Sequence, residues 1–89
     1  MTNRGDRVLV RTFGGYPCVR RLWDATRYAC IVAEDAAFER MLAGDVSAGV
    51  GVPSEDVFEL PTDLTTLDAQ QPFTGWDGLR PFRPAAVNA

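Results

Sequence analysis

Two adjacent glycines, Gly14 and Gly15, separate two segments with the composition of β-strands. Arg7 to Phe13 is rich in β-branched and apolar residues, and Tyr16 to Trp23 is long enough to return beside it. Paired glycines supply the positive φ angles that a two-residue hairpin turn requires. The pattern predicts an antiparallel hairpin near the start of the chain and favours a mainly β fold.

The sequence after this hairpin predicts a small sheet with one inserted helix. The expected elements are a turn at 24–26, a strand at 27–33, a short helix that starts at Asp35 and stops at Gly44, a strand at 49–52, a turn at 53–56 and a strand at 57–60. Asp35 is a typical helix N-cap, and Gly44 is typical of a helix end. Phe38, Met41 and Leu42 share one helical face by their spacing, so we expect that face to be packed.

The segment that closes this pattern resembles part of a known family. Val52-Pro53-Ser54-Glu55-Asp56-Val57 is similar to the last part of SH3 domains, in which an apolar residue and Pro-Ser precede a short helical turn and a valine. The resemblance covers these six residues and implies a small, bent SH3-like barrel of five strands. The tyrosine usual before the valine is Asp56 here, and the N-terminal Ala-Leu-Tyr-Asp-Tyr-type motif is absent. Pro53 is the one matching groove position, so the resemblance implies the barrel rather than a proline-rich ligand.

The composition changes after residue 60, which divides the chain into an SH3-like barrel at 1–60 and a proline- and aromatic-rich C-terminal extension at 61–89. The extension holds four of the six prolines, and residues 62–71 predict a short helix. Four of its apolar residues recur every three positions: Phe73, Trp76, Leu79 and Phe82. Disordered segments are usually poor in aromatic residues. We therefore expect the extension to dock on its own barrel, on a second copy of the chain or on a partner.

The two predicted turns decide which side chains share a face of the sheet, because successive side chains alternate between the faces. With the turn at Gly14 and Gly15, Val10 lies opposite Val19; with the loop at 24–26, Leu22 lies opposite Tyr28. One face is apolar and is predicted to form the core: Val8, Val10, Val19, Ala29, Ile31 and Ala33, with Arg21 and Trp23 toward one end. The other face mixes apolar, aromatic and arginine side chains: Leu9, Arg11, Phe13, Tyr16, Cys18, Arg20, Leu22, Tyr28, Cys30 and Val32.

The mixed face has three interpretations. In a bent barrel both faces of a strand are partly buried, so its aromatic residues would close the core. Alternatively, the extension lies across it. In the third interpretation it is a binding surface, on which aromatic rings stack and arginines make bidentate contacts. The candidate partner-binding residues are Arg11, Phe13, Tyr16, Arg20 and Tyr28 from the sheet, and Trp76 and Phe82 from the extension.

Charge is unevenly distributed along the chain. Residues 1–27 contain six arginines and two aspartates, whereas residues 28–60 contain Arg40 and seven acidic residues. Arginines suit phosphates and base edges, which makes nucleic acid the alternative partner. A net charge of −3 opposes that alternative, because nucleic-acid affinity depends on displacing counterions from phosphates. The arginines can instead pair with acidic residues of the same chain: Glu34, Asp35, Glu39, Glu55, Asp56 and Glu59.

The missing residue types exclude most enzymatic mechanisms. The nine basic residues are all arginine, and there is no histidine. Without lysine and histidine the chain cannot form a Schiff base, a Ser-His or Cys-His pair, or a zinc-histidine site. Cys18 and Cys30 lack the spacing of a metal-binding pair. We therefore expect no enzyme activity, no metal and no cofactor.

The sequence also contains no apolar stretch long enough to span a bilayer and no hydrophobic signal region near its start, so we expect a cytoplasmic protein without a membrane partner. It predicts a non-catalytic protein-interaction module, of the kind found among bacterial or phage accessory and inhibitor proteins. Its partner would be another protein, and a homodimer through the extension is a further arrangement. The alternative is a nucleic-acid-binding small barrel that uses the arginine and aromatic face of the N-terminal hairpin.

Overall fold

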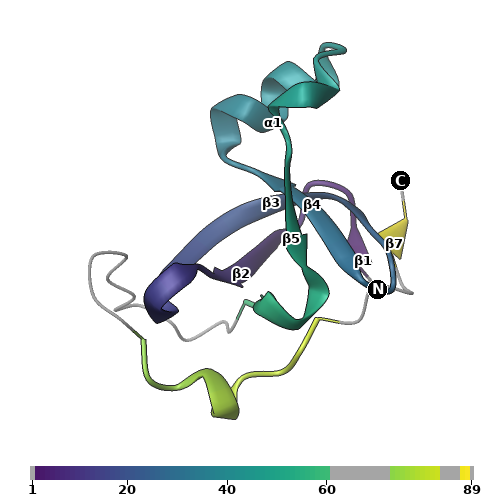
Figure 1. Ribbon diagram of the computed structural model, residues 1–89. Helices are drawn as coiled ribbons and strands as arrows, with labels where there is room; N and C mark the ends of the chain where they lie inside the picture. Colours follow the sequence, from purple (N-terminus) through teal and green to yellow (C-terminus); the bar gives the residue numbers. More distant parts are fainter. Residues whose placement is uncertain (1, 61–72, 83–86, 89) are drawn as a thin grey trace.

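The computed structural model describes residues 2–60, 73–82 and 87–88. Five antiparallel strands form one sheet in the order β5-β4-β3-β2-β6 (Figure 1). The strands are β2 (Arg7–Arg11), β3 (Pro17–Ala25), β4 (Ala29–Ala33), β5 (Val50–Pro53) and β6 (Val57–Glu59). The predicted mainly β fold is confirmed. Closure into a barrel is not: β5 and β6 are the two edges and do not pair with each other, so the sheet stays open.

The first hairpin turns over residues 12–16 rather than over its two glycines alone. Both glycines have positive φ angles, 84° and 82°, and lie in a 3-10 helix, η1. An N–H···O bond of 2.9 Å between the first and last residues of the loop closes it. The longer loop shifts the register by one residue, so Val10 lies opposite Cys18 and not opposite Val19.

The second hairpin turns later than predicted. β3 continues past the expected turn, and the Thr26 hydroxyl closes the loop at 26–28 by accepting two backbone N–H groups. A β-bulge follows Leu22 and changes the register within the strand. Leu22 therefore lies opposite Val32 and not opposite Tyr28.

The changed register redistributes the side chains between the faces of the sheet. The main core combines residues that were predicted on two different faces with residues from β6 and the extension: Val8, Val10, Leu22, Cys30, Val32, Val57 and Phe82. Val19 and Ile31, both predicted in the core, are 39% exposed. Ala29 is also exposed, whereas Ala33 is buried as predicted.

The helix α1 (Asp35–Leu42) lies beyond one end of the sheet (Figure 1). Phe38 and Met41 are buried, as their spacing predicts, and pack with Ala33 in a second small core. Trp23 closes this core from β3, with its ring edge-on to Phe38 at a centroid distance of 5.7 Å. The third predicted core residue of the helix, Leu42, is exposed.

The helix begins and ends close to the predicted residues. Glu34 occupies the N-cap position that the sequence assigned to Asp35. Gly44 follows the last turn with a φ of 114°, a left-handed conformation that favours glycine, so the helix stops there as expected.

The extension packs along β6 where the structure describes it, at residues 73–82. The backbone N–H of Glu59 donates to the carbonyl of Arg80 at 2.9 Å, and the N–H of Phe82 donates to the carbonyl of Val57 at 3.0 Å. The Phe82 side chain thereby enters the main core. One edge of the sheet is thus covered by a segment of the same chain.

Short elements connect the strands. The 3-10 helix η3 (Ser54–Asp56) joins β5 to β6 and is the helical turn expected after Pro53. Two further 3-10 helices are η2 (Val46–Ala48) and η4 (Trp76–Gly78), and β1 (Thr2–Asn3) pairs in parallel with β7 (Val87–Asn88). The helix predicted at 62–71 lies outside the described residues. Within the described ranges, no helix is long and apolar enough to cross a membrane.

Candidate interaction surfaces

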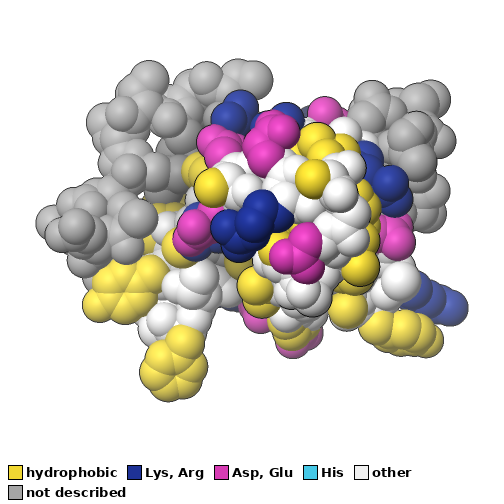
Figure 2. Space-filling view, turned by 90° about the horizontal axis from the view of Figure 1, so that it is seen from above, with side chains coloured by type: hydrophobic (Ala, Val, Ile, Leu, Met, Phe, Trp, Pro, Cys, Tyr) yellow, Lys and Arg dark blue, Asp and Glu magenta, His cyan; other side chains and the backbone are white. Residues whose placement is uncertain are grey.

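The loop at residues 12–16, here called the hairpin tip, presents two aromatic side chains to solvent. Phe13 is fully exposed, and Tyr16 is more than one-third exposed. Figure 2 shows hydrophobic side chains that project from the ends of the molecule. Because the Phe13 ring buries no surface against its own chain, it is available for contact with another molecule.

The extension forms hydrogen bonds with the backbone of the hairpin tip. The carbonyl oxygen of Gly15 accepts the backbone N–H of Phe73 at 3.0 Å and the indole Nε1–H of Trp76 at 3.3 Å. The Trp76 ring packs edge-on against Phe73 and tilted against Phe58, with centroid distances of 5.0 and 5.1 Å. These contacts fix the backbone that carries the exposed Phe13 side chain.

Arg11 lies at the base of the hairpin tip, and its guanidinium is used within the chain. Its Nε donates to Oδ1 of Asp56 at 3.0 Å, and its NH2 group donates to the backbone carbonyl of Glu55. The guanidinium carbon also lies 5.3 Å from the ring centre of Phe58 and 5.6 Å from that of Trp76. Arg11 therefore ties β2 to η3 and to the extension.

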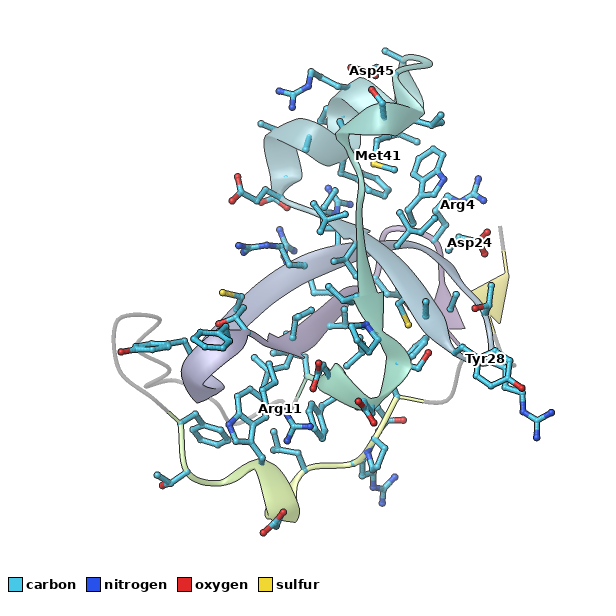
Figure 3. All side chains as sticks on the ribbon, in the orientation of Figure 1. Arg4, Arg11, Asp24, Tyr28, Met41 and Asp45 are labelled. Atoms are coloured by element: carbon cyan, nitrogen blue, oxygen red, sulfur yellow. The ribbon has the colours of Figure 1, made fainter. Side chains whose placement is uncertain are left out.

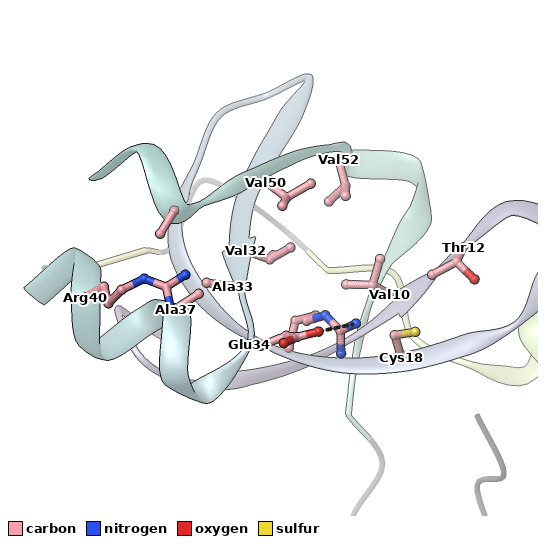
Figure 4. Close-up of a pocket in the computed structure, with 12 residues that line it drawn as sticks. Val10, Thr12, Cys18, Val32, Ala33, Glu34, Ala37, Arg40, Val50 and Val52 are labelled. Atoms are coloured by element: carbon pink, nitrogen blue, oxygen red, sulfur yellow. Dashed lines mark ion pairs between the residues drawn. The ribbon is translucent and has the colours of Figure 1, made fainter. Parts of the chain in front are cut away.

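A pocket of about 380 Å³ lies between β5 and β3, on the side where the sheet does not close (Figure 4). We call it the seam pocket. Val50 and Val52 of β5 form one wall, and Cys18 and Arg20 of β3 form the other. The floor is the exposed part of the main core, so the pocket is apolar along most of its length.

The charged groups of the seam pocket gather at its helix end. Arg20 pairs with Glu34 at 3.5 Å, as the dashed line in Figure 4 shows. Arg40 of α1 extends toward the pocket from the other side (Figure 4). Arg40 forms no ion pair among the residues that the structure describes, so the pocket carries one uncompensated positive charge.

The structure separates the seven candidate binding residues into four places. Phe13 and Tyr16 form the hairpin tip, with Arg11 and Trp76 beneath it. Arg20 lies in the wall of the seam pocket. Tyr28 is 78% exposed. Its loop follows β3 whereas the hairpin tip precedes β3, so Tyr28 and the hairpin tip lie at opposite ends of that strand. Figure 3 shows Tyr28 far from Arg11. Phe82 is buried in the main core.

Sequence reasoning missed the seam pocket, including Val50, Val52 and Arg40. A short Val-Gly-Val strand beside a proline is recognisable, but the missing closure of the sheet is a long-range property. No local pattern predicts that β5 has one neighbouring strand among the described residues and not two.

Four of the six hairpin arginines form ion pairs with acids of the same chain. Besides Arg11 and Arg20, these are Arg7 with Asp35 at 3.3 Å and Arg21 with Glu39 at 3.9 Å. Arg4 stacks over the Trp23 ring at 4.4 Å and donates to its backbone carbonyl. Ion pairs within the chain thus engage most of the arginines of the basic hairpin. Most of the acids involved are well exposed, so each pair contributes little to stability.

The two cysteines differ in environment. Cys18 is half-buried in the wall of the seam pocket, whereas Cys30 is fully buried in the main core. Burial raises the pKa of the Cys30 thiol, opposed by a weak contact with the Ser54 hydroxyl at 3.8 Å. A buried thiol with a raised pKa is a poor nucleophile.

We compared the chain with protein-family models, with curated proteins and with solved structures, and none of the three comparisons found a match. The surfaces described above therefore have to be interpreted from their own geometry.

Proposed function

We propose that this chain is a non-catalytic protein-interaction module that inserts Phe13 into an apolar pocket of a partner protein. The observation that carries the proposal is a fully exposed phenylalanine on a hairpin tip whose backbone is anchored from below. A fixed aromatic side chain is a typical binding hot spot, because little conformational freedom is lost on association. Tyr16, beside it, adds a ring with a hydroxyl that suits the rim of such an interface.

Internal pairing of the arginines favours a protein over a nucleic acid as the partner. Arg7, Arg11, Arg20 and Arg21 each lie within 4 Å of a carboxylate of the same chain. A phosphate backbone would have to displace those carboxylates and approach a chain of net charge −3. The hairpin tip itself carries no charged side chain.

We also propose that the open sheet is SH3-like. The strand order, in which the last strand pairs with the first strand of the sheet, and the 3-10 helix before β6 support this resemblance. The proposed contact uses the hairpin tip and not a proline-peptide groove.

A pair of photoreactive variants tests the proposed function. A benzoylphenylalanine residue replaces Phe13 in one variant and Tyr28 in the other, and both are irradiated in the cells that make the protein. Both positions are exposed aromatics at opposite ends of β3, so neither change should affect folding. We expect one protein to be crosslinked from position 13 and not from position 28, and excess wild-type chain to compete for it.

Affinity measurements with the crosslinked protein then quantify the contact. Full burial of a phenylalanine contributes about 1.5–3 kcal/mol, so Phe13→Ala should weaken binding roughly 10- to 150-fold. Tyr28→Ala should leave the Kd unchanged. Crosslinks from position 13 that disappear after nuclease treatment would overturn the proposal in favour of nucleic acid.

A further inference from the structure

The side of β5 that pairs with no strand among the described residues is here called the open edge, and its backbone groups alternate in direction. The N–H of Ser54 donates to the carbonyl of Tyr28 on the β4 side at 3.0 Å. In an antiparallel ladder, residues that bond to one neighbour alternate with residues that point away from it. Val52 and Val50 are two and four positions before Ser54, so their backbone groups also point to β4. The backbone groups of Gly51 therefore point to the open edge.

Among the residues that the structure describes, Gly51 supplies the one free N–H donor on the open edge. The next outward-pointing residue on one side is Pro53, which has no N–H. On the other side, the N–H of Gly49 is directed to the carbonyl of Val46 at 3.4 Å. The open edge thus presents the N–H and the carbonyl of Gly51, with the carbonyl of Gly49 on one side and that of Pro53 on the other.

This pattern is complementary to itself. When two antiparallel strands place the same outward-pointing residue opposite its own copy, each N–H donates to the other carbonyl across a two-fold axis. We propose that a second copy of this chain binds the open edge in this way, with Gly51 of the two copies opposite each other. Two reciprocal N–H···O bonds would then form at Gly51.

The side chains next to Gly51 suit the same arrangement. Val50 is 58% exposed, and it would face Val52 of the partner subunit across the axis. Both valines line the seam pocket, so the second copy covers the apolar floor that the open sheet leaves exposed. An added Cβ at Gly51 meets no atom within 4 Å, so Gly51→Ala fits β5 without a clash.

The two-fold axis also brings opposite charges together. Counting outward from Gly51, η3 of one copy comes beside η2 of the other, and η2 packs against α1. η3 carries Glu55, whereas the end of α1 carries Arg40. Neither side chain has an ion pair among the residues that the structure describes. The dimer supplies each with a partner of opposite sign, twice by symmetry.

The covered edge explains why association would stop at two copies. At the other edge of the sheet, residues 80–82 already pair with β6. An interface that uses the same edge of both chains is closed, whereas a second open edge would continue into a fibre. The inference is independent of the contact proposed at Phe13.

Sedimentation equilibrium of the purified chain tests the dimer, with three variants at Gly51 and Phe13. Gly51→Pro removes the outward N–H and leaves the bonds from Val50 and Val52 to β4 in place, so we expect its dimer Kd to rise at least tenfold. Gly51→Ala keeps the N–H and should dimerise like the wild type. Phe13→Ala should also dimerise normally, which separates this inference from the proposed function.

A charge exchange provides the second test and does not depend on a proline. Glu55→Arg should weaken the dimer, because it faces Arg40 of the partner subunit with a like charge. Adding Arg40→Glu to the same chain should restore the affinity. A wild-type chain that stays monomeric at millimolar concentration would overturn the proposal, and so would a Gly51→Pro dimer of unchanged Kd. Loss of the dimer in Trp76→Ala but not in Gly51→Pro would also overturn it and assign the dimer to the extension.

Discussion

The two edge strands of the sheet differ in whether a described segment of the chain packs beside them. Val57 on β6 is fully buried, whereas Val50 on β5 is 58% exposed, although both are valines on short edge strands. The difference comes from residues 80–82, which bond to β6 and insert Phe82 behind it, whereas no described segment reaches the outer side of β5. An edge strand is therefore protected or available according to its neighbours and not according to its own composition.

The largest expected effect follows from removing the side chain that anchors the covered edge. Phe82 is buried among Val8, Val10 and Val57, so Phe82→Ala should lower the free energy of unfolding by about 3–5 kcal/mol. Urea denaturation followed by circular dichroism measures the change. Phe13→Ala deletes the same side chain at an exposed position and should stay within about 0.5 kcal/mol of the wild type. Equal losses for both variants would show that the extension does not stabilise β6.

The same substitution on both edge strands sharpens the comparison. Val57→Thr keeps the shape of the side chain but buries a hydroxyl with no partner, which should cost about 1–3 kcal/mol. Val50→Thr leaves its hydroxyl in solvent and should change the free energy of unfolding by less than about 0.5 kcal/mol. Thermal and urea unfolding of the two variants, measured at a concentration where both are monomeric, decide between these values. A costly Val50→Thr in the monomer would mean that β5 is covered after all.

A smaller effect is expected for the ion pair that ties β2 to η3 beside the covered edge. Arg11 and Asp56 are each about one-third exposed, so Asp56→Asn should cost only about 0.5–1 kcal/mol. Glu39 pairs with Arg21 at 3.9 Å and is far more exposed, so Glu39→Gln should be close to neutral. A double-mutant cycle between Arg11 and Asp56 isolates the coupling energy. A coupling energy no larger than that of the Arg21–Glu39 pair would show that the Arg11–Asp56 ion pair does not stabilise the covered edge.

The smallest expected effect concerns the two cysteines, Cys18 in the wall of the seam pocket and Cys30 in the main core. Because burial raises the pKa of Cys30 above its ordinary value of 9.0, the unfolded chain ionises first as the pH rises. The free energy of unfolding should be unaffected by this thiol below pH 9 and should decrease at higher pH. Unfolding at pH 8 and pH 10 in the wild type and in Cys30→Ala measures the difference. A thiol reagent should also modify Cys18 much faster than Cys30, and equal rates would contradict the burial of Cys30.

The sequence was sufficient to predict the elements whose signals are local. Gly44 and the spacing of Phe38 and Met41 located the helix, and Pro53 with the following acids located the turn before β6. The paired glycines located the hairpin but not its register, because a five-residue loop and a two-residue turn place the same glycines at the tip. That single shift moved Leu22 into the core and Val19 out of it.

The candidate surface was predictable only in part, and for a related reason. Phe13 and Tyr16 belong to the turn itself, so their exposure does not depend on register. Arg11 and Phe82 are engaged by contacts across 45 and 25 residues, with Asp56 and Val57 respectively, which no local pattern encodes. The open edge of β5 was missed because it depends on β5 and β6 not pairing with each other, which is a long-range property of the sheet.

The order of the segments along the chain means that the covered edge is completed late in folding. β6 precedes residues 80–82 in the chain, so a chain in which the sheet forms first still lacks the segment that shields β6. During that interval both edge strands lack a second neighbour among the described residues, and the main core lacks Phe82. An unshielded edge strand is prone to pair with another chain at this stage. The docking of residues 80–82 therefore covers β6 and places Phe82 in the main core in a single step.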